Sequence, residues 1–268
     1  MQRFCDIITS RELTDDVFAI TLEAGALAET AKPGQFLHIK CGDGVLLRRP
    51  ISICDCRDGY IKIVFRVVGP GTRWLSEQKS GQLDVLGPLG NGFSIEGHNV
   101  LLIGGGIGVP PLLYAAQMAS GLTTAILGFP KASDVILKDQ FRDACKRVVL
   151  TTDDGSAGEA GFVTSVLARE LMFVKYDAIL ACGPMPMLAA VAEIAAQYDV
   201  PCQVSLEERM ACGVGACLGC TVPMKDGKNL RACYDGPVFD ARVVAWPPVQ
   251  EQPEAVTCGC GCAHTHEH

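Results

Sequence analysis

The sequence predicts an α/β plus β protein of three parts. An antiparallel β-barrel is expected over residues 1–97, a parallel sheet covered by helices over residues 98–204, and a small cysteine-rich segment over residues 205–247. Apolar residues alternate with polar ones in the first part, whereas strand and helix patterns alternate in the second. The third part holds four cysteines but has no sustained period, so we expect something other than an apolar core to order it. Residues 248–268 follow as a Cys- and His-rich tail that we expect to be flexible.

The first part should consist of short antiparallel strands. In YIKIVFRVVG the residues Ile61, Ile63, Phe65 and Val67 occupy every second position, and turn signals such as RDG, GPG and GNG separate runs of this kind. Alternation with a period of two gives a strand one buried face. A succession of such strands that ends near Phe93 is typical of a small barrel.

In the second part, short apolar runs alternate with helical patterns. The expected strands are NVLLIGG, TTAILGF, RVVLTT, DAILACG and PCQVSL. The segments between them, VPPLLYAAQMA, VILKDQFRDAC, FVTSVLAREL and PMLAAVAEIAAQY, have helical patterns. This order predicts a parallel sheet with crossover helices.

Composition narrows the possible functions. The chain has 268 residues, of which 49% are hydrophobic and 20% charged, and its net charge is -7 without any basic run. Nucleic-acid binding is therefore not expected, since phosphate recognition needs clustered Lys and Arg. No apolar run has the length of a membrane span, and the N-terminus MQRFCDIITSRELTDD lacks the apolar region of a signal peptide. We expect a cytoplasmic protein.

The chain contains fourteen cysteines, and in the cytoplasm thiols stay reduced. We therefore expect metal ligands and scattered buried residues rather than disulfides. The second group mostly comprises Cys5, Cys41, Cys54, Cys56, Cys145, Cys182 and Cys202.

The stretch LLIGGGIGVPPLL predicts a strand, a glycine turn and a helix. Its glycines are Gly104, Gly105, Gly106 and Gly108, and Pro110 suits the first turn of the helix. Such a turn lets a phosphate approach backbone N–H groups at a helix N-terminus. The stretch departs from G-x-G-x-x-G, so a tight turn without a ligand is an equal alternative on this motif alone.

The stretch ACGPMPML supports a nucleotide site. Cys182, Gly183 and Pro184 follow a later strand of the same predicted sheet. Ligands of open parallel sheets bind beyond the carboxyl ends of the strands, so both turns should face one crevice. Met187 is expected to fill the core rather than contact a ligand.

Two stretches of the predicted barrel form a second candidate site. GVLLRRPISI places arginines and a serine on an apolar strand, and an arginine can clamp a phosphate while a hydroxyl can bind the edge of a flat ring. A strand end that faces solvent is the alternative. In RVVGPGTRWLS, Gly71 and Thr72 should precede a short helix, with Thr72 as its N-cap beside an anion site.

Four cysteines carry the clearest metal signal. Cys212, Cys217, Cys220 and Cys233 have the spacing C-x4-C-x2-C followed by a distant cysteine, which is the plant-type [2Fe-2S] pattern, whereas structural zinc commonly uses two C-x2-C pairs. Gly213, Gly215 and Gly219 let the backbone curve around a cluster and direct N–H groups to its sulfurs.

Together, R-P-x-S, G-G-G-I-G-x-x-P-L and C-G-P resemble the ferredoxin reductase superfamily. With SLEERMACGVGACLGC and ACYDGPVF, the chain up to about Trp246 resembles the electron-transfer subunits of NAD-dependent dihydroorotate dehydrogenases. The resemblance implies an oxidoreductase subunit without catalytic side chains of its own. Members often carry R-x-Y-S, and Ile51 replaces the aromatic residue here, so this position offers no ring for stacking.

The resemblance also implies the cofactors FAD, NAD and [2Fe-2S]. It assigns the nicotinamide nucleotide to the two turns of the predicted sheet. It assigns FAD to the barrel, at Arg49, Pro50, Ile51, Ser52, Arg66, Val67, Val68, Gly71 and Thr72. Electrons would pass between NAD and the FMN of a catalytic subunit that converts dihydroorotate to orotate, in a heterotetramer. NAD is preferred to NADP because GFPKASD offers only Lys131 as a cation, beside Asp134.

Two other functions stay open. Related chains are subunits of NADH-dependent ferredoxin:NADP reductases or sulfide dehydrogenases, although four cysteine ligands favour the orotate enzyme. A non-catalytic metal-binding adaptor is the alternative of another class.

The tail ends in CGCGCAHTHEH, and we expect Cys258, Cys260, Cys262 and the histidines 264, 266 and 268 to bind a divalent ion such as zinc without a role in electron transfer. A tail without a selected role is the alternative.

Overall fold

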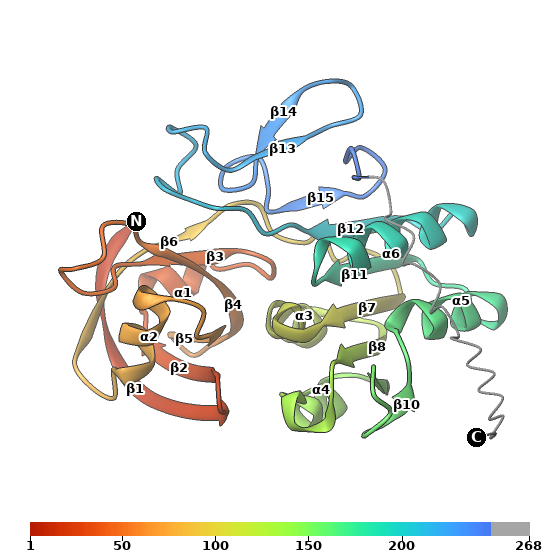
Figure 1. Ribbon diagram of the computed structural model, residues 1–268, viewed down its shortest axis with the longest axis horizontal. Coiled ribbons are helices and arrows are strands. Elements are labelled where there is room, and N and C mark those ends of the chain that lie inside the picture. Colours follow the sequence, from red (N-terminus) through yellow and green to blue (C-terminus); the bar gives the residue numbers. More distant parts are fainter. Residues whose placement is uncertain (248–268) are drawn as a thin grey trace, which may run out of the picture.

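The computed structural model describes residues 1–247 and contains a closed barrel, a seven-stranded sheet and a two-stranded ribbon (Figure 1). The Cys- and His-rich tail and its expected metal ligands lie outside the described residues. Among residues 1–247, no helix has both the length and the apolar character needed to cross a membrane.

The barrel confirms the expected antiparallel architecture. Its strands follow one another around the barrel in the order β1-β2-β5-β4-β3-β6, and β6 pairs with β1 to close it. The apolar faces of the strands meet inside, where Ile20, Leu22, Ile61 and Ile63 are fully buried. The elements of this part are β1 (Gln2–Thr14), β2 (Val17–Glu23), α1 (Ala26–Thr30), β3 (Phe36–Ile39), β4 (Arg49–Arg57), β5 (Tyr60–Arg66), α2 (Pro70–Glu77) and β6 (Gln82–Leu89).

The expected parallel sheet is also confirmed. Its strands are β7 (Asn99–Gly105), β8 (Leu122–Phe129), β9 (Arg147–Thr152), β10 (Glu159–Ala160), β11 (Ala178–Cys182) and β12 (Cys202–Ser205), in the order β10-β9-β8-β7-β11-β12. The elements between them are η1 (Gly106–Gly108), α3 (Val109–Met118), η2 (Ala132–Asp134), α4 (Lys138–Ala144), α5 (Val163–Phe173) and α6 (Met185–Gln197).

Successive residues of β7 supply two separate cores. Val100 and Leu102 join a buried cluster with residues of α3 and α4, whereas Leu101 and Ile103 join another with residues of α5 and α6. This arrangement follows from the period of two, because neighbouring side chains of a strand point to opposite faces. The sheet therefore lies between two helical layers.

The cysteine-rich segment does share an apolar core, and the expectation that it has none is wrong. It forms β13 (Thr221–Pro223), β14 (Asn229–Arg231) and β15 (Val238–Asp240), and β15 extends the large sheet by pairing antiparallel with β12. Val222 and Phe239 are buried in the same cluster as Leu188 of α6. The strands have three residues each, so no period shows in the sequence, and the edge of the large sheet supplies the other side of the core.

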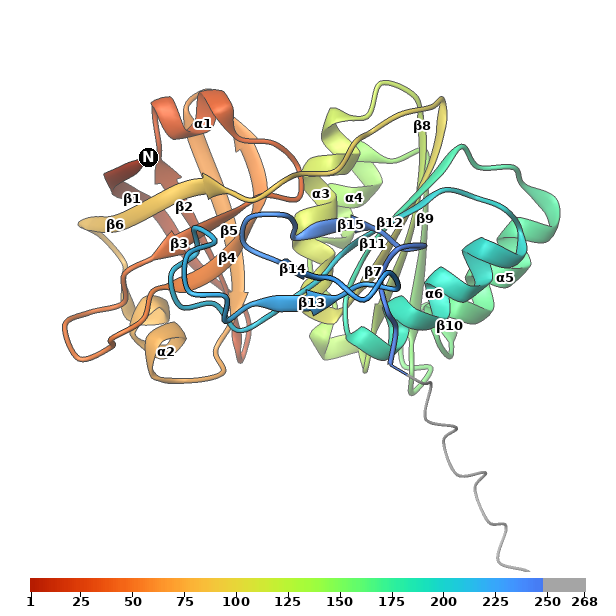
Figure 2. The same ribbon diagram turned by 90° about the horizontal axis from the view of Figure 1, so that it is seen from above.

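The cysteine-rich segment lies over the junction between the barrel and the large sheet (Figures 1 and 2). On the barrel side, Phe36 of β3 belongs to the same buried cluster as Cys220 and Cys233. On the same side, Asn91 N–H donates to the carbonyl of Gly236 at 2.6 Å. The segment thus contacts both of the larger parts.

Candidate functional site

The side chain of Arg49 lies against the first turn of α2. A Cβ added to Gly71 would lie 2.6 Å from Arg49 Nε, so the guanidinium uses the space that glycine leaves. Arg49 Nη1 donates to the carbonyl of Leu47 at 2.7 Å. The first turn of a helix has N–H groups without intrahelical partners, and an arginine beside them is suited to bind phosphate. The structure therefore brings together the two barrel stretches that the sequence predicts to share a site.

The three residues after Arg49 alternate between two faces of β4. Pro50 is paired with His38 and Ser52 with Phe36, on the outer face of the barrel. Ile51 points inward and packs in the barrel core. This alternation is what a strand dictates, and it directs Pro50 and Ser52 towards the other parts of the molecule.

The end of β5 is tied to the turn before β2. Arg66 Nε lies 3.0 Å from Asp16 Oδ2, although the two atoms are not aligned as a hydrogen bond. Val67 N–H donates to the carbonyl of Asp16 at 2.8 Å. The guanidinium of Arg66 and the N–H of Val67 are thus already engaged with Asp16.

Thr72 is not the N-cap of α2, and that expectation is wrong. Gly69 is the N-cap and the helix begins at Pro70, because proline fits the first helical position. Thr72 is the third residue of the helix, and its Oγ1 accepts from Val68 N–H at 2.9 Å and Gly69 N–H at 3.2 Å. The hydroxyl thus fixes the turn in front of the helix.

The glycine turn after β7 is in direct contact with the turn after β11. Gly104 is the register partner of Cys182, and a Cβ at Gly108 would lie 2.5 Å from Gly183 N. Only glycine permits this approach at position 108. Gly106 has φ 54 and nothing within 4 Å of a Cβ position, so its backbone is open to a ligand.

Met187 covers the glycine turn. Pro184 is the N-cap of α6, and the thioether of Met187 in its first turn would lie 2.5 Å from a Cβ at Gly105. Met187 is partly buried against the core, in agreement with its expected packing role. Burial raises the pKa of the Cys182 thiol to about 12, more than a hydrogen bond with Ser205 offsets, so this cysteine is a neutral thiol at physiological pH.

Acidic residues lie near Lys131, the lysine of the GFPKASD stretch after β8. Asp134 lies in η2 after Lys131, and Asp154 N–H donates to the carbonyl of Pro130 at 3.3 Å. The pKa of Asp153 is raised by burial and by the neighbouring Asp154. This acidic surrounding disfavours the 2′-phosphate of NADP and is compatible with NAD.

The four predicted cysteine ligands lie together in two pairs. Cys217 N–H donates to Cys212 Sγ at 3.4 Å, and Cys233 N–H donates to Cys220 Sγ at 3.5 Å. Cys217 is exposed, Cys212 is half-buried, and the second pair is buried. In the described part of the chain, no three His, Cys, Asp or Glu side chains meet as ligands of one metal ion. An arrangement in two pairs is compatible with a binuclear cluster, in which each iron takes two cysteines.

Backbone N–H groups point at the cysteine sulfurs. Those of Val214, Ala216 and Cys217 donate to Cys212 Sγ at 3.4, 3.3 and 3.4 Å, and Gly215 N–H donates to Cys233 Sγ at 3.1 Å. Burial raises the pKa of Cys212, but the hydrogen bonds from these N–H groups outweigh it and bring the pKa to about 6. The segment is therefore built to stabilise sulfur that carries negative charge.

Two glycines allow the segment to curve. Gly213 and Gly215 have φ of 72 and 80, a conformation that disfavours other residues. A Cβ at Gly215 would lie 2.9 Å from Tyr234, and one at Gly213 would overlap the ring of His38.

His38 is the residue that sequence reasoning missed. Its side chain is fully buried, and neither ring nitrogen has a hydrogen-bond partner. Burial lowers the pKa of His38, and the backbone carbonyls of Arg48 and Cys212 offset this only in part. The available signal was a histidine within FLHI, an otherwise apolar strand.

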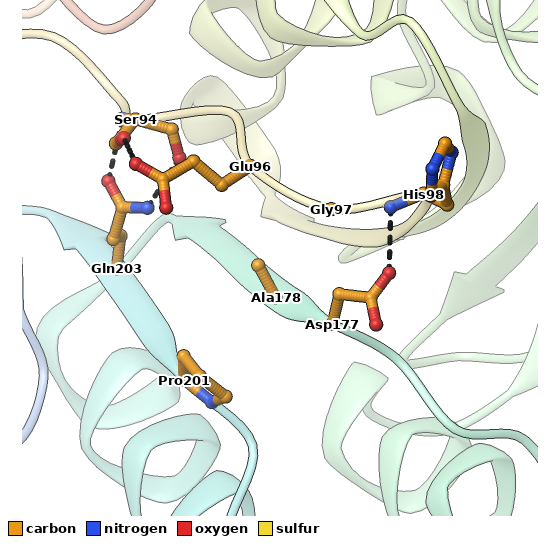
Figure 3. Close-up of a pocket in the computed structure, with 8 residues that line it drawn as sticks. All are labelled: Ser94, Glu96, Gly97, His98, Asp177, Ala178, Pro201 and Gln203. Carbon is orange, nitrogen blue, oxygen red and sulfur yellow. Dashed lines mark hydrogen bonds between the residues drawn. The ribbon is translucent and has the colours of Figure 1, made fainter.

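A hollow of about 480 Å³ lies at the amino ends of the parallel strands, opposite to the end that carries the glycine turn (Figure 3). Its lining includes His98, Ala178 and Pro201, which stand at the amino ends of β7, β11 and β12. Nucleotides bind beyond the carboxyl ends of parallel strands, so this hollow is separate from the glycine turn.

The comparisons with known proteins agree with this geometry. Residues 207–245 match the iron-sulfur cluster binding domain of dihydroorotate dehydrogenase B. The electron transfer subunit of dihydroorotate dehydrogenase B (NAD(+)) from Caldanaerobacter subterraneus subsp. tengcongensis is 42% identical, covering 89% of this chain and 96% of the relative. The corresponding subunit from Bacillus velezensis is 39% identical, covering 88% and 96%.

Solved structures share this fold. An NADH-dependent reduced ferredoxin-NADP oxidoreductase has a TM-score of 0.83 and 33% identity, covering 90% of both chains. A ferredoxin reductase of carbazole 1,9a-dioxygenase has a TM-score of 0.63 at 23% identity, covering 75% of this chain and 67% of its own, and supports the fold alone. The identity and coverage of the curated relatives show that the chain belongs to the family of dihydroorotate dehydrogenase B electron transfer subunits.

Proposed function

We propose that the chain passes electrons between NAD and the FMN of a catalytic subunit that oxidises dihydroorotate to orotate, as a step of pyrimidine biosynthesis. FAD and a [2Fe-2S] cluster on this chain connect the two. The curated relatives are named electron transfer subunits, which implies a catalytic partner. The proposed assembly is a heterotetramer with two copies of each subunit.

The observation that carries the proposal is the place of the four cysteines. They lie in a segment that packs on both the barrel and the large sheet, with backbone N–H groups directed at their sulfurs. The barrel provides the Arg49 site, and the sheet provides the paired turns at Gly108 and Gly183. One chain thus offers three candidate sites for three electron carriers.

The chemistry divides naturally among these sites. When bound, NAD exchanges a hydride, FAD exchanges electrons in pairs or singly, and the [2Fe-2S] cluster exchanges one at a time. Arg49 and the first turn of α2 would hold the FAD pyrophosphate, with Pro50, Ile51, Ser52 and the Arg66–Val68 strand end lining the rest of the site. The glycine turn and residues Cys182–Pro184 would hold the nucleotide, while Cys212, Cys217, Cys220 and Cys233 ligate the cluster.

The surface beside Cys217 is suited to contact the partner. Val214, Leu218 and Tyr234 are large apolar or aromatic residues that are 48, 62 and 59% exposed. Leu218 has φ 58, a conformation that costs a leucine about 1–2 kcal/mol. Strain of this kind is concentrated at functional sites, so we propose that Leu218 contacts the catalytic subunit.

A cytoplasmic location is also proposed. None of the eleven cysteines of the described residues forms a disulfide, as expected in a reducing compartment.

The function is tested with the chain co-purified anaerobically with its catalytic subunit. We expect flavin and iron-sulfur absorption, and dihydroorotate-dependent reduction of NAD. The Cys220→Ser variant should lose the electron transfer to the partner, whereas NADH should still bleach the bound FAD. Cys54→Ser is the matched control, because Cys54 is buried in the barrel region away from the four ligands.

Two results would contradict this function. A chain without flavin and iron-sulfur absorption would instead be a metal-binding adaptor. Full dihydroorotate-dependent activity in Cys220→Ser would show that the electrons bypass the cluster.

A second candidate rests on the structural relative at 33% identity, an NADH-dependent reduced ferredoxin-NADP oxidoreductase. In that case the partner would exchange electrons with ferredoxin and NADP. Ferredoxin-dependent reduction of NADP by the purified complex, without any response to dihydroorotate, would favour this candidate.

A further inference from the structure

His38 stands between the strand of the proposed FAD site and the segment of the cysteine ligands. It lies on the outer face of β3, where Pro50 of β4 is its register partner. Its neighbour on that face, Phe36, is buried in one cluster with Cys220 and Cys233. His38 is not among the residues proposed to bind FAD, the nucleotide or the cluster.

The first turn of the ligand segment lies directly on the imidazole. A Cβ at Gly213 would overlap His38 Nδ1 and lie 3.0 Å from Cε1. Gly213 also has φ 72, so both its backbone conformation and the contact with His38 require glycine. The ring therefore supports the peptide that joins Cys212 to Gly213.

The two ring nitrogens without partners indicate that His38 supports the Cys212–Gly213 peptide through a polar contact. Both ring nitrogens lack a hydrogen bond although the residue is 0% exposed. An unsatisfied buried polar group destabilises the fold, and an apolar side chain would fill the same space without that cost. The other residues of β3, Phe36, Leu37 and Ile39, are all apolar. A histidine here thus needs a nearby acceptor. The backbone carbonyls of Arg48 and Cys212 both raise its pKa, and the Cys212–Gly213 peptide is the one that lies against Nδ1.

We propose that His38 is a positioning residue whose ring N–H holds the Cys212–Gly213 peptide and thereby raises the reduction potential of the cluster. The held peptide fixes the turn whose N–H groups, from Val214, Ala216 and Cys217, donate to Cys212 Sγ. Such hydrogen bonds favour the reduced cluster, because it carries more negative charge on its sulfurs. This inference rests on the proposed [2Fe-2S] site but goes beyond the assignment of its ligands.

The test compares His38→Met with His38→Gln in the full-length chain bound to its catalytic subunit. The two side chains have similar length, and only glutamine keeps an N–H donor. We expect the methionine variant to have a one-electron reduction equilibrium of the cluster about tenfold less favourable, which is a shift of about 59 mV to lower potential. The glutamine variant should stay near the parent. Potentiometric titration followed by electron paramagnetic resonance measures both.

Phe36→Leu is the matched control. It loosens packing on the same face of the same strand without changing a hydrogen bond, so it should lower stability and leave the potential unchanged. Cluster retained in the glutamine variant but lost from the methionine variant would also support the proposal, since only the donor separates them.

Equal potentials in the methionine variant and the parent would overturn it, and so would loss of the cluster from the glutamine variant. A parent chain without any cluster signal would instead refute the proposed function.

Discussion

The side chain of Arg49 occupies the space that any residue larger than glycine would fill at position 71. The two positions are distant in sequence, and the barrel brings β4 and α2 together. One arginine then lies beside the first turn of a helix, where the N–H groups of Gly71 and Thr72 have no intrahelical partner. The proposed FAD site thus depends on a contact between two residues that no local pattern connects.

Arg49→Ala should weaken FAD binding by about tenfold to a hundredfold, because a hydrogen bond to a charged group contributes about 1.5–3 kcal/mol. Gly71→Ala should reproduce much of this loss, since its Cβ would displace the guanidinium. Gly59→Ala is a control with nothing within 4 Å, although its positive φ adds some strain. Fluorescence titration of released FAD measures the affinity. Undiminished affinity in Arg49→Ala would remove this arginine from the site.

At this scale the sequence predicts ligands better than their surroundings. The cysteine spacing and the R-P-x-S stretch identify candidate residues because the residues of each motif stand close together in the sequence. His38 escaped prediction because its burial depends on Gly213, which reaches it only after two parts of the chain have packed together. The role of Thr72 was misassigned because Pro70 starts the helix two residues earlier.

Among the elements, β7 and β11 are held in register at their starts by one carboxylate. Asp177 Oδ2 accepts from the N–H groups of His98 and Asn99 at 2.7 and 2.9 Å, and Figure 3 shows the first of these bonds. These two strands carry the glycine turn and the Cys182 turn at their other ends. A shift in register at the starts of β7 and β11 would therefore displace the two turns of the proposed nucleotide site.

Asp177→Ala should lower the stability of the chain in a pH-dependent manner. The N–H groups of Asn99 and His98 hold the pKa of Asp177 below its ordinary value of 3.8. A lowered folded-state pKa contributes stability that is present above pH 3.8 and disappears as the pH falls through the folded value. The difference in free energy of unfolding between the parent and the variant should thus have its full value at pH 7 and shrink below pH 4.

Urea unfolding followed by circular dichroism at each pH measures this difference. Because the two chains are compared at the same pH, any loss of stability at low pH that does not involve Asp177 cancels. Glu193→Ala, which removes an exposed carboxylate within α6, is the control and should change little. A difference that is the same at pH 7 and pH 3 would show that the carboxylate charge contributes nothing.

Elements with a sustained period were predictable, and the short ones were not. The sequence predicts β7, β8 and β9 from apolar runs that the structure confirms. It does not predict that β15 joins the large sheet, because a three-residue strand has no period and its pairing with β12 is set by tertiary packing.

For the whole molecule, the cysteine-rich segment has one side that packs and one side that stays open. Its inner side joins the core with Val222 and Phe239, while Cys217 and Leu218 remain exposed. On the proposed function, the open side is where electrons would leave the chain by the shortest path to another protein.

Leu218→Asn should separate binding from folding. Asparagine tolerates φ 58 better than leucine does, so the chain should be as stable as the parent or slightly more so. Binding to the catalytic subunit should nevertheless weaken by about fivefold or more, as expected when a contact residue worth over 1 kcal/mol is lost. Calorimetric titration of the two subunits and thermal unfolding of the single chain measure the two effects. Phe173→Asn is the matched control, because Phe173 is 81% exposed at the end of α5, a helix that Figure 1 shows apart from the β13–β14 ribbon. If Leu218→Asn binds as tightly as the parent, the strained leucine is not part of the contact and the partner approaches the cluster from another direction.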